Sequence, residues 1–162
     1  MPRSNRSSRA IIIAALLTLS SGTFLAAARS PAPGDACSLI TKEDAAAALG
    51  EAATGPKAVG PITDGTGSTV TGCEYTGSGI HSIHLNLTRL PAKSVAMFKM
   101  ICAKATKDGL AGMGDVACWY NAKHEELHVI TGAAFLSVQL RRSGNPTEPI
   151  IAVMKKALSR LK

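Results

Sequence analysis

Aromatic residues are scarce in this chain, which has one tryptophan, two tyrosines and three phenylalanines among 162 residues. A nucleic-acid-binding protein usually combines a dense basic stripe with interleaved aromatic side chains. The densest basic cluster here consists of Lys155, Lys156, Arg160 and Lys162, and no aromatic residue lies near it in the sequence. The cluster is typical of a solvated helix face, so nucleic acid is not an expected partner.

The chain also lacks an uninterrupted apolar run long enough to cross a bilayer. The run Ala10–Leu19 ends at Ser20, follows three arginines within the first nine residues, and precedes the small residues 26–28. These are the three parts of a secretory signal peptide. We therefore predict a signal peptide at residues 1–28, a flexible leader at 29–36 and a single domain at 37–162. A retained membrane anchor is the alternative.

Removal of the predicted signal peptide leaves the mature chain with only a small excess of basic over acidic residues. The signal carries three of the 18 basic residues, so the mature chain has 15 basic against 11 acidic residues. We expect a periplasmic or extracellular protein whose mature chain has no transmembrane segment. Its expected binding partner is another protein, an envelope component or a small ligand.

No C-x-x-C pair occurs, which argues against a closed zinc site. Four cysteines are present, and an even count in an exported protein predicts two disulfides. We expect Cys37–Cys73, which ties the mature N-terminus to a strand, and Cys102–Cys118, which ties a helix to the next strand. The other two pairings remain alternatives.

Hydrophobic spacing predicts an α+β fold with the order αβββαβββα. Short turns between consecutive strands favour an antiparallel sheet with helices packed on it. Met97 and Met100 flank the apolar stripe of the middle helix and are interpreted as core residues. His81 and His84 are interpreted as ordinary polar strand residues. The expected helices cover 41–49, 92–105 and 145–162, and the expected strands cover 57–59, 68–75, 80–90, 116–120, 127–130 and 135–140.

The stretch His124-Glu125-Glu126-Leu127-His128 matches the H-E-x-x-H pattern of zinc proteases, and Glu148 has the spacing of a third ligand. That chemistry needs both histidines on one helix face. Apolar residues instead lie on both sides of a polar middle, which indicates a hairpin. We predict that His124 and Glu125 lie in a solvent-exposed turn and that His128 points sideways from a strand. No cofactor is expected, and a zinc metallopeptidase is the alternative.

Several short motifs resemble those of small exported bacterial domains of unknown function, which include actinobacterial lipoproteins. The resemblance implies a PsbP-like α+β fold and no catalytic residues. The chain differs from the lipoproteins because no apolar residue stands three positions before Cys37. The motifs are Cys37-Ser38-Leu39-Ile40-Thr41, Leu49-Gly50, Gly72-Cys73-Glu74-Tyr75 and the stretch from Gly112 to Trp119.

The leading functional hypothesis is a non-enzymatic binding or structural module of the cell envelope. Its binding surface would be the sheet or the loop Gly65-Thr66-Gly67-Ser68, which lacks the lysine and the helix of a phosphate-binding loop. Besides the zinc peptidase, a further alternative is attachment to anionic polymers or lipid surfaces through the basic C-terminal helix.

Overall fold

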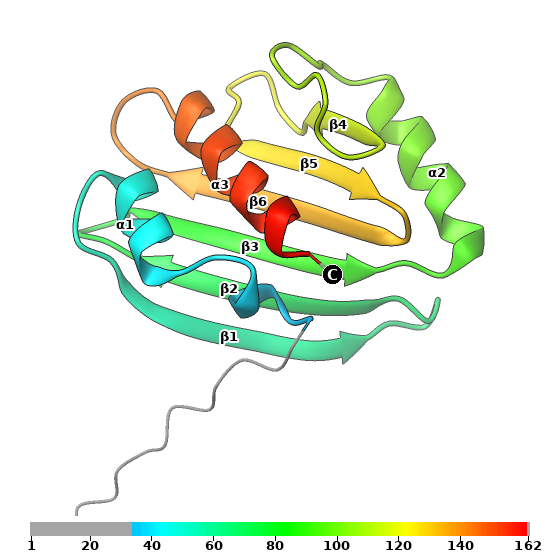
Figure 1. Cartoon of the computed structure of the whole chain (residues 1–162), viewed down its shortest axis with the longest axis horizontal. Coiled ribbons are helices and arrows are strands. Elements are labelled where there is room, and N and C mark those ends of the chain that lie inside the picture. Colours follow the sequence, from blue (N-terminus) through cyan, green and yellow to red (C-terminus); the bar gives the residue numbers. More distant parts are fainter. Residues whose placement is uncertain (1–33, 162) are drawn as a thin grey trace, which may run out of the picture.

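The computed structural model describes residues 34–161, so the predicted signal peptide and most of the predicted leader lie outside the described residues. The fold is α+β, with a six-stranded antiparallel sheet in the order β1-β2-β3-β6-β5-β4 (Figure 1). None of the described helices is long and apolar enough to cross a membrane. The elements are η1 (Ala36–Ser38), α1 (Lys42–Leu49), β1 (Thr54–Thr63), β2 (Thr69–Thr76), β3 (Ser82–Arg89), α2 (Ala92–Ala103), β4 (Val116–Trp119), β5 (Glu126–Thr131), β6 (Ala134–Arg141) and α3 (Thr147–Arg160).

The sheet consists of two meanders, β1-β2-β3 and β4-β5-β6, joined where β3 pairs with β6. In that pairing Leu85 lies opposite Val138 and Leu87 opposite Leu136. All four side chains are buried because they point to the same face of the sheet, on which η1, α1 and α3 pack. We call this the helical face. Figure 1 shows α1 and α3 lying over it.

α2 packs on the other side of the sheet, which we call the opposite face. Cys102 joins Cys118 and Ile130 there in a second, smaller hydrophobic cluster. The rings of Phe98 and Phe135 extend it with centroids 5.2 Å apart. The opposite face of β1, β2 and β3 has no helix over it among the described residues.

Both expected disulfides are present, Cys37–Cys73 and Cys102–Cys118. The first attaches η1 to β2 on the helical face, and the second attaches α2 to β4 on the opposite face. Each bridge thus holds a short helical element on its own face of the sheet. Disulfides of this kind fit a protein that folds in an oxidising compartment.

The ends of α1 follow the local rules expected from the sequence. The Asp44 backbone N–H donates to Thr41 Oγ1 at 3.2 Å, and the Thr41 N–H donates to Asp44 Oδ2 at 3.0 Å, which completes a capping box. Gly50 ends the helix with a φ of 77°, a conformation that glycine adopts without strain.

β1 was underestimated from the sequence. Only residues 57–59 were expected to be extended, but the strand covers Thr54–Thr63. Its proline content suggested a loop, because proline cannot donate to a sheet. β1 is an edge strand, however, and an edge strand tolerates proline where the N–H would face away from its single neighbour.

Candidate functional site

The zinc-protease pattern lies in a turn and a strand. His124 and Glu125 belong to the connection between β4 and β5, and His128 lies within β5. One part of the prediction was wrong, because the His124 ring is half-buried and stacks on Trp119 with centroids 4.5 Å apart. Trp119 offers a flat apolar surface at the end of β4, and this contact shields the imidazole from water.

The remaining residues of the pattern point to different parts of the molecule. His128 lies on the opposite face, where its Nε2 is 2.8 Å from Glu126 Oε1. Glu148 lies in the first turn of α3, which packs on the helical face. Within residues 34–161 no group of three or more His, Cys, Asp or Glu side chains is placed to hold a metal ion.

From this geometry we expect purified protein to retain less than stoichiometric zinc after equilibration with the metal and dialysis. Glu125→Gln should leave both the zinc content and the free energy of unfolding unchanged, because Glu125 is exposed. Atomic absorption and urea titration measure the two quantities. Stoichiometric zinc that disappears in His128→Ala would contradict the expectation and favour the peptidase.

The basic C-terminal helix has less free charge than its sequence suggests. Lys156 Nζ lies 2.6 Å from Asp44 Oδ1, and the Arg160 guanidinium bonds both Asp44 Oδ2 and the Leu39 carbonyl. Two of the four basic residues are therefore paired with a buried carboxylate on α1. Lys155 is exposed, and Lys162 lies outside the described residues.

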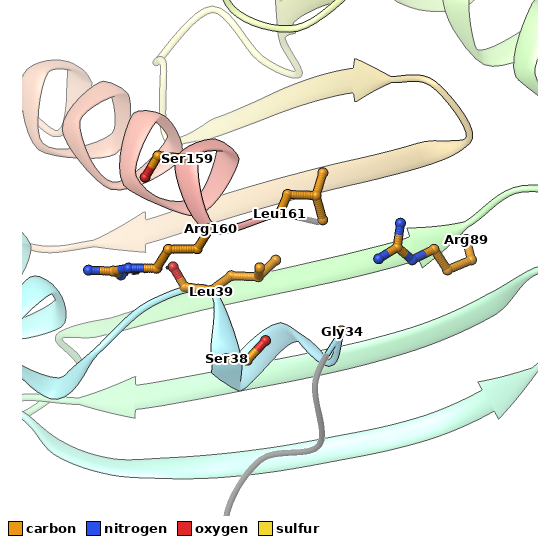
Figure 2. Close-up of a pocket in the computed structure, with 7 residues that line it drawn as sticks. All are labelled: Gly34, Ser38, Leu39, Arg89, Ser159, Arg160 and Leu161. Atoms are coloured by element: carbon orange, nitrogen blue, oxygen red, sulfur yellow. Dashed lines mark hydrogen bonds between the residues drawn. The ribbon is translucent and has the colours of Figure 1, made fainter.

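A cavity of about 590 Å³ opens beside the end of α3 and contains two arginines, Arg89 and Arg160. Figure 2 shows the Arg160 guanidinium turned away from Arg89, toward α1. Because Arg160 is occupied by Asp44, the two cations do not converge on a common anion. This geometry does not make the cavity an anion-binding site.

The two surfaces expected to bind a ligand are also less distinctive than predicted. The loop 65–68 is the turn between β1 and β2. Asp64 Oδ1 accepts hydrogen bonds from the Thr66 and Ser68 backbone N–H groups. Formation of this turn is sufficient to explain the residues of the loop. The open sheet surface carries mixed polar residues, with His84 Nε2 at 3.5 Å from Glu74 Oε1.

The outer side of α2 is the most unusual surface among the described residues. Met97, Met100 and Ile101 are 49%, 56% and 59% exposed, although the sequence led us to place both methionines in the core. Spacings of three and four residues put these side chains on one helix face, together with the exposed Lys93 and Lys104. A helix that is apolar on its buried and its outer sides usually has a second surface to contact.

A cavity of about 210 Å³ opens next to this face, between α2 and the strands β4, β5 and β6. Ile101 and Tyr120, 59% and 68% exposed, stand at its rim. A cavity of about 150 Å³ lined by apolar side chains is sufficient to hold benzene in other proteins. The site can therefore hold a short apolar group. Its lining consists of Phe98, Ile101, Cys102, Ala105, Cys118, Trp119, Tyr120, His128 and Phe135.

Sequence reasoning missed this site because periodicity identifies which residues share a helix face, but not which face is buried. The available signal was charge. The segment from Ala92 to Lys107 contains four lysines and no acidic residue, and lysines beside a buried stripe would normally mark the solvent side.

Comparisons with protein-family models, with curated proteins and with solved structures found no match for this chain. The resemblance to exported bacterial domains with a PsbP-like fold therefore remains an expectation from short sequence motifs.

Proposed function

We propose that this chain is an exported binding module that docks on an anionic lipid surface of the cell envelope through α2. The observation that carries the proposal is the outer face of α2, where Met97, Met100 and Ile101 are exposed between Lys93 and Lys104. Apolar side chains of this kind enter the boundary between headgroups and acyl chains, while lysines contact anionic headgroups.

The positive charge on the outer face of α2 favours an anionic surface, rather than a second copy of the chain, as its binding partner. Lys93, Lys104 and Lys107 are exposed and have no ion-pair partner among the described residues, whereas Lys99 is paired with Asp115 at 2.7 Å. Two copies meeting through α2 would bring these lysines together, which opposes self-association. An anionic surface would be attracted. The cavity beside Ile101 supports the same partner because it can receive the end of an acyl chain.

The prediction is that the purified exported protein sediments with vesicles containing equal amounts of phosphatidylglycerol and phosphatidylcholine. Met97→Ser with Met100→Ser should weaken binding roughly 30-fold, since about 1 kcal/mol is lost for each half-exposed methionine. Lys93→Gln with Lys104→Gln should have a similar effect, because each lysine near an anionic surface contributes about 1 kcal/mol.

The matched control is Lys155→Gln, which removes an exposed charge from α3 and should change binding little. Binding should also fall with rising salt. Absence of sedimentation with the anionic vesicles would refute the proposal. A large effect of Lys155→Gln together with none from the α2 variants would transfer the function to the C-terminal helix.

A further inference from the structure

The connections after α1, before β3 and after β6 lie at the same end of the sheet, away from α2 (Figure 1). One polar side chain from each connection takes part in a chain of hydrogen bonds there. Glu51 follows α1, His81 precedes β3, and Ser143 follows β6. Glu51 Oε1 lies 2.6 Å from His81 Nδ1, and His81 Nε2 lies 3.2 Å from Ser143 Oγ. Both distances are those of hydrogen bonds.

The order of the atoms is the one that acyl transfer requires. A carboxylate at Nδ1 holds the imidazole in the tautomer whose Nε2 can accept a proton from a serine hydroxyl. Hydrogen bonds from the Ser78 hydroxyl and N–H and from His81 lower the pKa of Glu51 to about 2, so its carboxylate stays ionised well below neutral pH. Ser78 Oγ donates to Glu51 Oε2 at 2.6 Å, which leaves Oε1 aimed at the ring.

Ser143 is held in place by its neighbour. Arg142 Nε donates to the Ser143 carbonyl at 3.1 Å, and Arg142 Nη1 donates to the Ala48 carbonyl at 2.6 Å. The second bond attaches the β6–α3 loop to the end of α1, only a few residues before Glu51. The hydrogen-bonded chain Glu51–His81–Ser143, which we call the relay, is thus held in place at both ends.

A cavity of about 400 Å³ lies against this relay, and His81, Ser143 and Arg141 line it. Arg141 is exposed and has no ion-pair partner among the described residues. A guanidinium that lines the same cavity as the nucleophile can stabilise the negative charge that develops on the carbonyl oxygen of a bound ester. The lining combines polar residues such as Gln139 with apolar residues such as Ile80 and Leu140, which suits a small carboxylic ester.

We infer that Glu51, His81 and Ser143 form an esterase site for small carboxylic esters, an activity that goes beyond the proposed lipid docking. His81 Nε2 takes the Ser143 hydroxyl proton while Oγ bonds to the carbonyl carbon. The bond from that carbon to the alcohol oxygen then breaks, and the alcohol leaves with the proton from His81. Water hydrolyses the acyl-serine through the same steps, which yields the acid and regenerates the hydroxyl. Glu51 is a positioning residue that acts through His81.

The test is hydrolysis of p-nitrophenyl acetate by the purified exported protein, combined with labelling by diisopropyl fluorophosphate and peptide mapping. We expect label on Ser143, and a fall in kcat/KM of at least about 100-fold in Ser143→Ala and in His81→Gln. Glu51→Gln should lower kcat with little change in KM and alter the pH profile of kcat, a change that a merely structural role would not produce. Ser159→Ala, on the exposed side of α3, is the matched serine control and should behave as wild type.

Exposed histidines can hydrolyse this substrate slowly on their own, so the serine variant is decisive. Ser143→Ala that retains wild-type kcat/KM, or a protein that takes no label at Ser143, would overturn the inference and leave the three residues as a structural clamp. Circular dichroism of each variant confirms that lost activity is not lost folding.

Discussion

Replacing both Cys37 and Cys73 by alanine is expected to lower the free energy of unfolding by about 4 kcal/mol. The bridge closes a segment with a sequence separation of 36 residues, and a crosslink of that span removes much of the conformational freedom of the unfolded chain. Both sulfurs are also buried in the main core between η1 and β2. Urea unfolding of the oxidised proteins, followed by Trp119 fluorescence, gives the difference.

The Cys102→Ala, Cys118→Ala protein is the matched control. Its bridge spans 16 residues, so the expected loss is smaller, about 3 kcal/mol. The effect should also be confined to α2 and its smaller cluster. A Cys37, Cys73 double variant that loses less stability than this control would contradict the ranking and show that the N-terminal segment is held mainly by packing.

Asp44→Asn is the second substitution with a large expected effect, a loss of about 2–3 kcal/mol. The carboxylate is 5% exposed and joins α1 to α3 through Lys156 and Arg160. Burial alone would raise the pKa of Asp44, but hydrogen bonds from Lys156, Arg160 and the Thr41 N–H outweigh it and hold the pKa well below its usual value. Asparagine keeps the size and the acceptor for Thr41, so the variant isolates the charge.

The loss should depend on pH in one direction. A carboxyl group whose pKa is lower in the folded state stabilises the fold fully above its unfolded pKa, and this contribution disappears as pH falls through the folded value. The difference between wild type and Asp44→Asn should therefore be largest near pH 7 and shrink between about pH 4 and pH 2. Glu43→Gln, an exposed neighbour, is the control and should change stability by no more than about 0.5 kcal/mol. A difference that is constant from pH 7 to pH 2 would rule out the ion pairs as its cause.

Local signals in the sequence predicted much of the fold. The capping box of Thr41 and Asp44 and the alternation of Ile83, Leu85 and Leu87 each depend on neighbours a few residues away. Patterns of this kind predicted the helix at 41–49 and the strand at 80–90, and the structure contains both elements as α1 and β3. The disulfide pairing was also confirmed. Four cysteines allow only three pairings, so the number of choices was small. The turn in the zinc-protease pattern was recognised by its polar middle.

Features that depend on which other element a helix or strand packs against could not be predicted from the sequence. The edge position of β1 makes its prolines tolerable, and sequence alone does not reveal which strand is at an edge. The exposure of Met97 follows from α2 lying on the opposite face, away from the main core. Glu51, His81 and Ser143 are separated by 30 and 62 residues. The β3–β6 pairing brings His81 and Ser143 together, and the packing of α1 against β3 and β6 adds Glu51.

We expect α2 to open locally without unfolding of the sheet. Its cluster of Cys102, Cys118 and Ile130 is separated from the main core by the sheet itself. Local opening of such a unit costs less free energy than global unfolding, so amide protons of α2 should exchange with solvent faster than those of the central strands β3 and β6. The covalent link from Cys102 to Cys118 keeps the C-terminal turn of the helix at β4 during this opening. The N-terminal turn follows β3 after only Leu90 and Pro91, and the Leu90 N–H donates to the Ala133 carbonyl at 2.8 Å, so the helix is held to the sheet at both ends.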